Sequence, residues 1–251
     1  MSELTQTELT HKVLAALSKI RTLVRTMDPA AVTEPSVLPG WKRTQLLAHV
    51  DGFALAATRQ LDTAGSQPPF EMYDGGMERR HEAIELTAMM RPAALLARTI
   101  ESLDALETSI GGISPEQWAL ATGFRDGGSV EDLFYAIWRE LVIHTSDFAL
   151  SYSVADWDPE FCAHLFEALE PRVPESRRYI LQPHGAQRIT LGHGADTTVL
   201  SGTAFDLAAW LAGRQTLGPV QATASADGTE LPELGPWLVR LKSESPKQAT
   251  S

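Results

Sequence analysis

The chain has 251 residues, of which 43% are hydrophobic, and 21 Lys and Arg residues stand against 32 Asp and Glu residues, a formal net charge of −11 at pH 7. This acidic balance argues against a protein that binds nucleic acid phosphates or an anionic membrane through basic residues. The apolar content argues against an intrinsically disordered chain. A single cysteine, Cys162, excludes an intrachain disulfide framework and a multi-cysteine metal site.

The first ten residues have neither the basic start nor the apolar stretch of a secretory signal. No window of the sequence approaches the roughly 20 apolar residues that a membrane-spanning helix needs. We therefore expect a cytoplasmic protein with no membrane partner and no nucleic acid partner.

Four segments place apolar residues three and four positions apart, which predicts amphipathic helices. The last segment opens with Ser129 as an expected N-cap and Asp132 three residues later, which is the spacing of a capping box. The segments are Thr10–Arg25, Thr44–Leu61, Pro92–Ser109 and Ser129–Tyr152. Helices of this length without strands between them predict an antiparallel four-helix bundle over residues 1–155.

Beyond residue 155 the pattern changes to short β-branched runs separated by turn residues. Helices are expected at Pro159–Leu169 and Thr203–Arg214. The expected strands are Tyr179–Gln182, Arg188–Leu191, Thr197–Leu200 and Val220–Thr223. The sequence thus predicts an α+β two-domain protein, with a smaller α+β domain at residues 156–242 and a flexible tail at residues 243–251.

Three polar side chains fall on the apolar faces of the predicted helices. His49 shares the face of Leu46 and Phe53, while Glu140 and His144 lie one turn apart on the fourth helix. Two imidazoles and a carboxylate are ligands for a divalent metal, with coordination positions left open as in catalytic sites. On spacing alone, a Glu–His hydrogen bond or a core histidine with satisfied hydrogen bonds is the commoner explanation.

Four blocks of sequence resemble the mycothiol-dependent maleylpyruvate isomerase family, part of the DinB-like superfamily of metal-binding four-helix bundles. They are LPGWKRTQLLAHVDG at 38–52, WRELVIHTSDFAL at 138–150, LSGTAFDLAAWLAGRQ at 200–215 and TELPELGPWL at 229–238. The resemblance spans nearly the whole chain and implies a DinB-like bundle followed by the family's C-terminal domain.

The resemblance implies that His49, Glu140 and His144 bind a divalent metal, with zinc expected. Asp147 fits the family's H-x-x-D pattern, which implies that it orients a ligand imidazole without binding the metal itself; the alternative is a solvated helix face. Trp41 is interpreted as a structural residue at the entrance of the second helix.

Arg214 matches an A-G-R segment by which the family places an arginine near the metal cleft. This implies a catalytic Arg214 that binds a substrate carboxylate or enolate, and the alternative is an arginine that caps its own helix. Tyr73 and Arg80 are candidates for binding substrate or thiol, although a surface charge cluster also explains the arginine.

The implied cofactor is mycothiol or a similar thiol, since Cys162 is best interpreted as a small core residue. In the implied reaction the thiolate adds to the cis double bond of maleylpyruvate, the bond rotates in the enolate, and the thiol leaves. Residues 101–150 hold two arginines and nine acidic residues, a field that disfavours a dicarboxylate. Transfer of the thiol to another electrophile, as by a thiol S-transferase, and a non-catalytic metal-dependent binding module therefore remain alternatives. A monomer is compatible with the family.

Overall fold

The computed structural model describes residues 4–125, 127–223 and 230–237. Contacts within the chain divide it into two compact units, residues 1–153 and 154–251. The predicted flexible tail at residues 243–251 lies outside the described residues.

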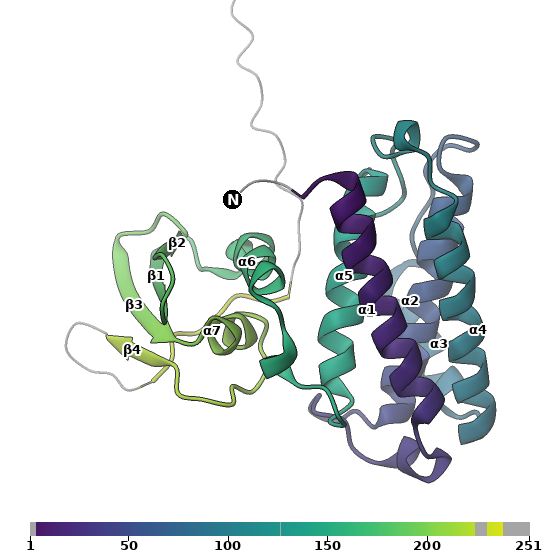
Figure 1. Cartoon of the computed structure of the whole chain (residues 1–251), viewed down its shortest axis with the longest axis horizontal. Coiled ribbons are helices and arrows are strands. Elements are labelled where there is room, and N and C mark those ends of the chain that lie inside the picture. Colours follow the sequence, from purple (N-terminus) through teal and green to yellow (C-terminus); the bar gives the residue numbers. More distant parts are fainter. Residues whose placement is uncertain (1–3, 126, 224–229, 238–251) are drawn as a thin grey trace, which may run out of the picture. The chain divides into compact units, whose positions relative to one another are not determined.

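Long helices build the first unit, as the apolar spacing predicted. Those helices are α1 Gln6–Thr26, α2 Arg43–Thr63, α4 Pro92–Gly111 and α5 Val130–Asp147. Helix α1 packs against α4 and α5, and α2 packs against the same two helices, so the four lie side by side in Figure 1. Their inward stripes form the core, in which Leu17, Leu46, Leu103 and Ile137 are fully buried.

Helix α3, Gly76–Ala88, was not among the predicted helices and packs against α2. Its sequence carries one buried residue, Ile84, so it has no apolar stripe for a periodicity analysis to find. The helix starts where Gly75 and Gly76 adopt φ angles of +77° and +74°, a conformation that glycine tolerates and other residues rarely adopt.

Both ends of α5 are held by side chains. At its start, Ser129 accepts from the Asp132 amide and Asp132 accepts from the Ser129 amide, which confirms the predicted capping box. The helix ends at Asp147 rather than at the predicted Tyr152, because Ala149 turns to φ +53°. The buried Arg43 guanidinium donates to the Phe148 carbonyl and opposes the negative end of the helix dipole.

The second unit contains helices α6 Pro159–Ala168 and α7 Ala204–Leu211 and, among the described residues, a sheet of four strands. The strands are β1 Arg177–Pro183, β2 Ile189–Leu191, β3 Asp196–Gly202 and β4 Gln221–Thr223. Each predicted strand is confirmed with shifted ends. The order is β2-β1-β3-β4, with β1 and β3 parallel and the other pairs antiparallel, so the fold is α+β.

Strand β1 shows why these runs were recognisable. Its burial alternates along the strand, with Tyr179 and Leu181 buried against the core of the unit. Among the described residues, no helix has the length and apolar character required to cross a bilayer.

Candidate metal centre

The three predicted ligands meet at one point between α2 and α5. The Nε2 atoms of His49 and His144 lie 2.8 Å apart. Glu140 Oε2 lies 3.0 Å from His49 Nε2 and 3.2 Å from His144 Nε2. Helix α2 packs directly against α5, so residues 91 or more positions apart in sequence present their donor atoms to the same small volume.

These donors fit a divalent cation. Two imidazole nitrogens and a carboxylate oxygen all lie within 4.8 Å of one another, and this is a donor set that zinc and related metals accept. The side chains of His49 and His144 are 5% and 12% exposed, whereas Glu140 is 29% exposed. Three such donors with one solvent-facing side would leave coordination positions for a further ligand.

Asp147 orients the His144 ring. Its Oδ2 atom lies 2.8 Å from His144 Nδ1, and its side chain is fully buried. The ring therefore donates its Nδ1 proton to the carboxylate and keeps a lone pair on Nε2, which is the form that binds a metal. The alternative of a solvated helix face does not hold for Asp147.

His49 has the opposite arrangement. The Arg80 guanidinium lies 2.7 Å from His49 Nδ1 and can only donate, so Nδ1 accepts and the neutral ring carries its proton on Nε2. That Nε2 proton points at Glu140 and at the lone pair of His144. A cation bound at Nε2 would replace the proton there, this proton would move to Nδ1, and Arg80 would have to withdraw from that atom.

The ionisation pattern of the cluster suits a cation. Burial, with the nearby His144, lowers the pKa of His49 to about 4. Burial acts to raise the pKa of Glu140, but hydrogen bonds from His144 and His49 outweigh it and hold that pKa well below its usual range. Burial lowers the pKa of His144, yet its hydrogen bonds to Asp147 and Glu140 raise it overall. A neutral His49 beside an ionised Glu140 is the state that metal binding requires, whereas the raised pKa of His144 means that a proton competes with a cation for this ring.

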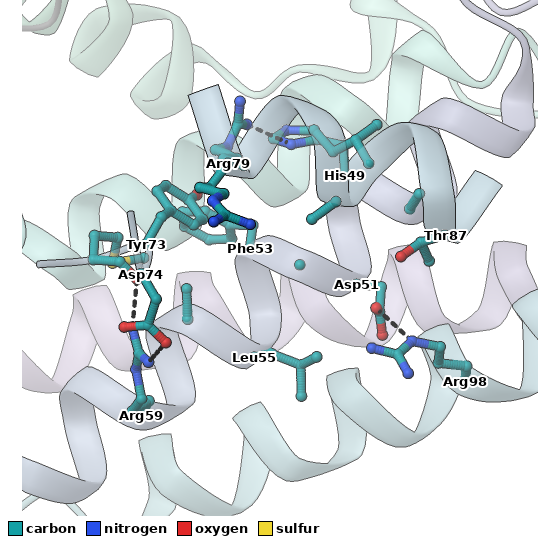
Figure 2. A pocket seen from close by; sticks show the side chains of 17 residues that line it. His49, Asp51, Phe53, Leu55, Arg59, Tyr73, Asp74, Arg79, Thr87 and Arg98 are labelled. Carbon is teal, nitrogen blue, oxygen red and sulfur yellow. Dashed lines mark hydrogen bonds and ion pairs between the residues drawn. The ribbon is translucent and has the colours of Figure 1, made fainter. Parts of the chain in front are cut away.

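A cavity of about 350 Å³ adjoins the centre and shares His49 with it. Its walls come from α2, from α3 and the segment before it, and from Arg98 of α4 (Figure 2). Both predicted pocket residues line it, and the Arg80 guanidinium stacks 5.0 Å from the centre of the Tyr73 ring. Arg80 thus contacts His49 and Tyr73, and its role in binding substrate or thiol stays a prediction.

Trp41 lies just before α2, as predicted, and its ring centre is 6.0 Å from that of His49. Cys162 is 1% exposed on α6, and burial raises the pKa of its thiol to about 12. The burial of Cys162 agrees with the structural role that the sequence indicated, whereas the structural role of Trp41 stays a prediction.

Arg214 belongs to the second unit, just after α7. Its guanidinium donates to the Ala212 carbonyl at 2.8 Å and lies 5.3 Å from the centre of the Trp237 ring. The first contact matches the helix-capping alternative, and the catalytic role of Arg214 stays a prediction.

Sequence reasoning missed the polar pairs on the cavity walls, Asp51 with Arg98 and Arg59 with Asp74. One signal was present: Asp51 interrupts the apolar run of α2 two residues after His49. A carboxylate in the middle of a buried helix normally has a partner or a function.

No curated protein matches the chain. The solved structures that match it include the mycothiol-dependent maleylpyruvate isomerase and a mutant of that protein with a histidine replaced by alanine. Each is 23% identical, covers 94% of this chain and 100% of that chain, and superposes with a TM-score of 0.82, so both show the same fold. The sequence profile described as the mycothiol maleylpyruvate isomerase N-terminal domain matches residues 13–149, more than half of the chain. The protein belongs to that family.

Proposed function

We propose that this protein is a metal-dependent enzyme that uses mycothiol or a similar low-molecular-weight thiol to isomerise maleylpyruvate or a related unsaturated acid. The observation that carries the proposal is the convergence of His49, Glu140 and His144 with one side exposed. Family membership supports the thiol and the reaction. In this proposal residues 1–155 form the metal-binding domain and residues 156–242 the C-terminal domain.

The cation supplies one property: a thiol bound to it loses its proton near neutral pH. The protein's own cysteine does not fill this role, since the Cys162 thiol is 1% exposed and burial raises its pKa to about 12. An external thiol is therefore the nucleophile.

The protein's residues hold the reacting groups in place. Asp147 keeps the His144 ring in the form whose Nε2 lone pair faces the centre. In the proposed reaction the thiolate sulfur adds to the cis carbon–carbon double bond, and the resulting single bond rotates in the enolate. Expulsion of the sulfur then restores the double bond as trans and returns the thiol. Arg214 is proposed to bind the carboxylate or enolate charge that develops.

Thiol transfer to another electrophile is the second candidate. Two of the four arginines that line the cavity are already matched by carboxylates, Arg59 by Asp74 and Arg98 by Asp51, and Arg79 and Arg80 are the other two. Not all of the acidic residues in 101–150 surround the metal donors, since Asp104 and Glu107 form ion pairs with Arg21 of α1.

The test is to incubate metal-loaded protein with mycothiol and maleylpyruvate, and separately with a panel of neutral electrophiles. Formation of the trans isomer, fumarylpyruvate, without net loss of thiol supports isomerisation, whereas thiol consumption supports transfer. If protein shown to hold its metal forms neither product, the enzymatic role is contradicted and a binding module remains. A His144→Ala variant serves as the control for background chemistry.

A further inference from the structure

The carbonyl groups in the last turn of α7 are bonded without the guanidinium of Arg214. The Arg214 backbone amide donates to the Ala209 carbonyl, and the Gly213 amide donates to the carbonyl three residues before it, both at 2.8 Å, which is a Schellman motif. Gly213 makes this turn at φ +68°, where glycine is favoured. The guanidinium of another arginine, Arg172, donates to the Leu211 carbonyl. The helix end is therefore capped and faced by a cation without help from the Arg214 side chain.

The stretch that leads to Trp237 is fastened to the second unit at two points. The Tyr179 hydroxyl of β1 donates to the Glu233 carbonyl at 2.9 Å. The Gly235 amide donates to the Arg172 carbonyl at 2.7 Å, and Arg172 Nε–H donates to the Gly235 carbonyl at 3.1 Å. A Cβ atom at position 235 would lie 3.1 Å from that Arg172 oxygen, so glycine permits the close approach. These bonds determine where the Trp237 side chain lies.

The Trp237 ring lies against two guanidinium groups. Its centre is 5.3 Å from the guanidinium of Arg214 and 5.2 Å from that of Arg172. A planar guanidinium stacks well on an indole because the cation faces the electron-rich ring. Arg172 is anchored by its hydrogen bonds to two backbone carbonyls. Arg214 is oriented by the ring and by its own bond to the Ala212 carbonyl at 2.8 Å.

The arrangement brings two like charges together. Burial and the nearby charge of Arg214 lower the pKa of Arg172, so each cation is felt by the other. Repulsion of this kind opposes folding, and the helix end is already capped without Arg214. Positive charge that is ordered on an aromatic ring but adds little to stability is typical of a group that binds an anion.

We propose that Trp237 is a positioning residue for Arg214. Its ring orients the Arg214 guanidinium before the substrate arrives, so that less side-chain freedom is lost when the guanidinium binds a carboxylate or enolate. The inference rests on the proposed function for the role of Arg214. It gives the Gly-Pro-Trp sequence at 235–237 a part in the reaction.

The first test does not depend on catalysis. In full-length protein, the Arg214 Nε–H resonance is assigned by its disappearance in Arg214→Ala, and its heteronuclear NOE measures the order of the side chain. We expect an ordered, ring-shifted signal in the wild type and a mobile signal in Trp237→Ala. Trp237→Phe keeps an aromatic face and should retain most of the order. Leu231→Ala removes a side chain that is 36% exposed in the same segment and should match the wild type.

The second test measures kcat/KM for the proposed reaction, beside zinc content and melting temperature. Trp237→Ala is expected to lower kcat/KM about tenfold at unchanged zinc content, and Trp237→Phe to stay within about threefold of the wild type. In an Arg214→Ala background, Trp237→Ala should have no further effect, because a positioning residue acts only through the residue that it orients. A ring that only stabilises the unit would lower the melting temperature and leave kcat/KM unchanged.

The inference is overturned if Arg214 is as ordered in Trp237→Ala as in the wild type, or if the effects of Trp237→Ala and Arg214→Ala on kcat/KM multiply. Full activity in Arg214→Ala also overturns it, since there would be no catalytic group to position. Failure of the proposed function looks different: the wild type then turns over no substrate, and the Arg214 resonance still decides whether Trp237 orders this side chain.

Discussion

Asp147 accepts a hydrogen bond from the Nδ1 atom of His144 at 2.8 Å, whereas the same atom of His49 accepts one from Arg80 at 2.7 Å. The two histidines that face each other across the centre therefore carry their protons on opposite nitrogens. His144 is set to bind a cation, and His49 becomes so once Arg80 releases its Nδ1 atom. This asymmetry gives two predictions of opposite sign.

Replacing Asp147 by Asn is expected to weaken zinc binding by about 10- to 100-fold, because the ring loses the acceptor that fixes its tautomer and raises its basicity. Competition with a chromophoric chelator measures the affinity. Asp132→Asn provides the matched control on the same helix, where the carboxylate caps the backbone and stability rather than affinity falls. Equal zinc affinity for Asp147→Asn and the wild type would contradict the orienting role.

Replacing Arg80 by Met is expected to tighten zinc binding by about three- to tenfold, because the bound state no longer loses the hydrogen bond between Arg80 and His49. The same chelator competition tests this, with Arg79→Met on the neighbouring residue as control. Weaker zinc binding in Arg80→Met than in Arg79→Met would show that Arg80 supports the metal-bound state.

Cys162 is expected to resist thiol reagents in the folded protein. A pKa raised to about 12 leaves on the order of one thiolate in ten thousand at pH 8, and the side chain is 1% exposed. Because a raised pKa favours the protonated thiol, labelling should speed up only as pH rises or as the protein unfolds. Rapid stoichiometric labelling at pH 8 without denaturant would reopen a role for Cys162 as nucleophile.

Arg214→Ala is expected to lower turnover by about 100-fold while the zinc content stays at the wild-type level. Arg214→Lys keeps the charge without the planar guanidinium, so its turnover should lie between those of the wild type and Arg214→Ala. Steady-state rates measured beside metal analysis of the same samples separate the roles. Full activity in Arg214→Ala would leave Arg214 as a helix cap through its contact with the Ala212 carbonyl.

Periodicity predicted the elements that have a strong apolar stripe or a strong alternation, and these include α1, α2, α4, α5 and the four described strands. The same patterns predicted that His49, Glu140 and His144 face inward, and the packing of α2 on α5 brings them together. Helix α3 was missed because Ile84 is its single buried residue, so docking on α2 rather than its own amphipathicity defines it.

The sequence also could not predict which charged side chains pair on the cavity walls. Asp51 meets Arg98 from α4, and Arg59 meets Asp74 from the segment before α3. Neither pair has a helical spacing, because each partner comes from a different element. The tautomer of His49 likewise depends on Arg80, which reaches it from α3. Long-range contacts of this kind follow from tertiary packing alone.

The central claim is that His49, Glu140 and His144 bind one divalent cation. The most direct test is elemental analysis of protein purified after growth with zinc, compared with His49→Ala and His144→Ala variants whose folding is verified by circular dichroism. The account predicts about one ion per chain in the wild type and close to none in either variant. A wild-type protein as free of metal as the variants, or variants that keep the full ion, would contradict it.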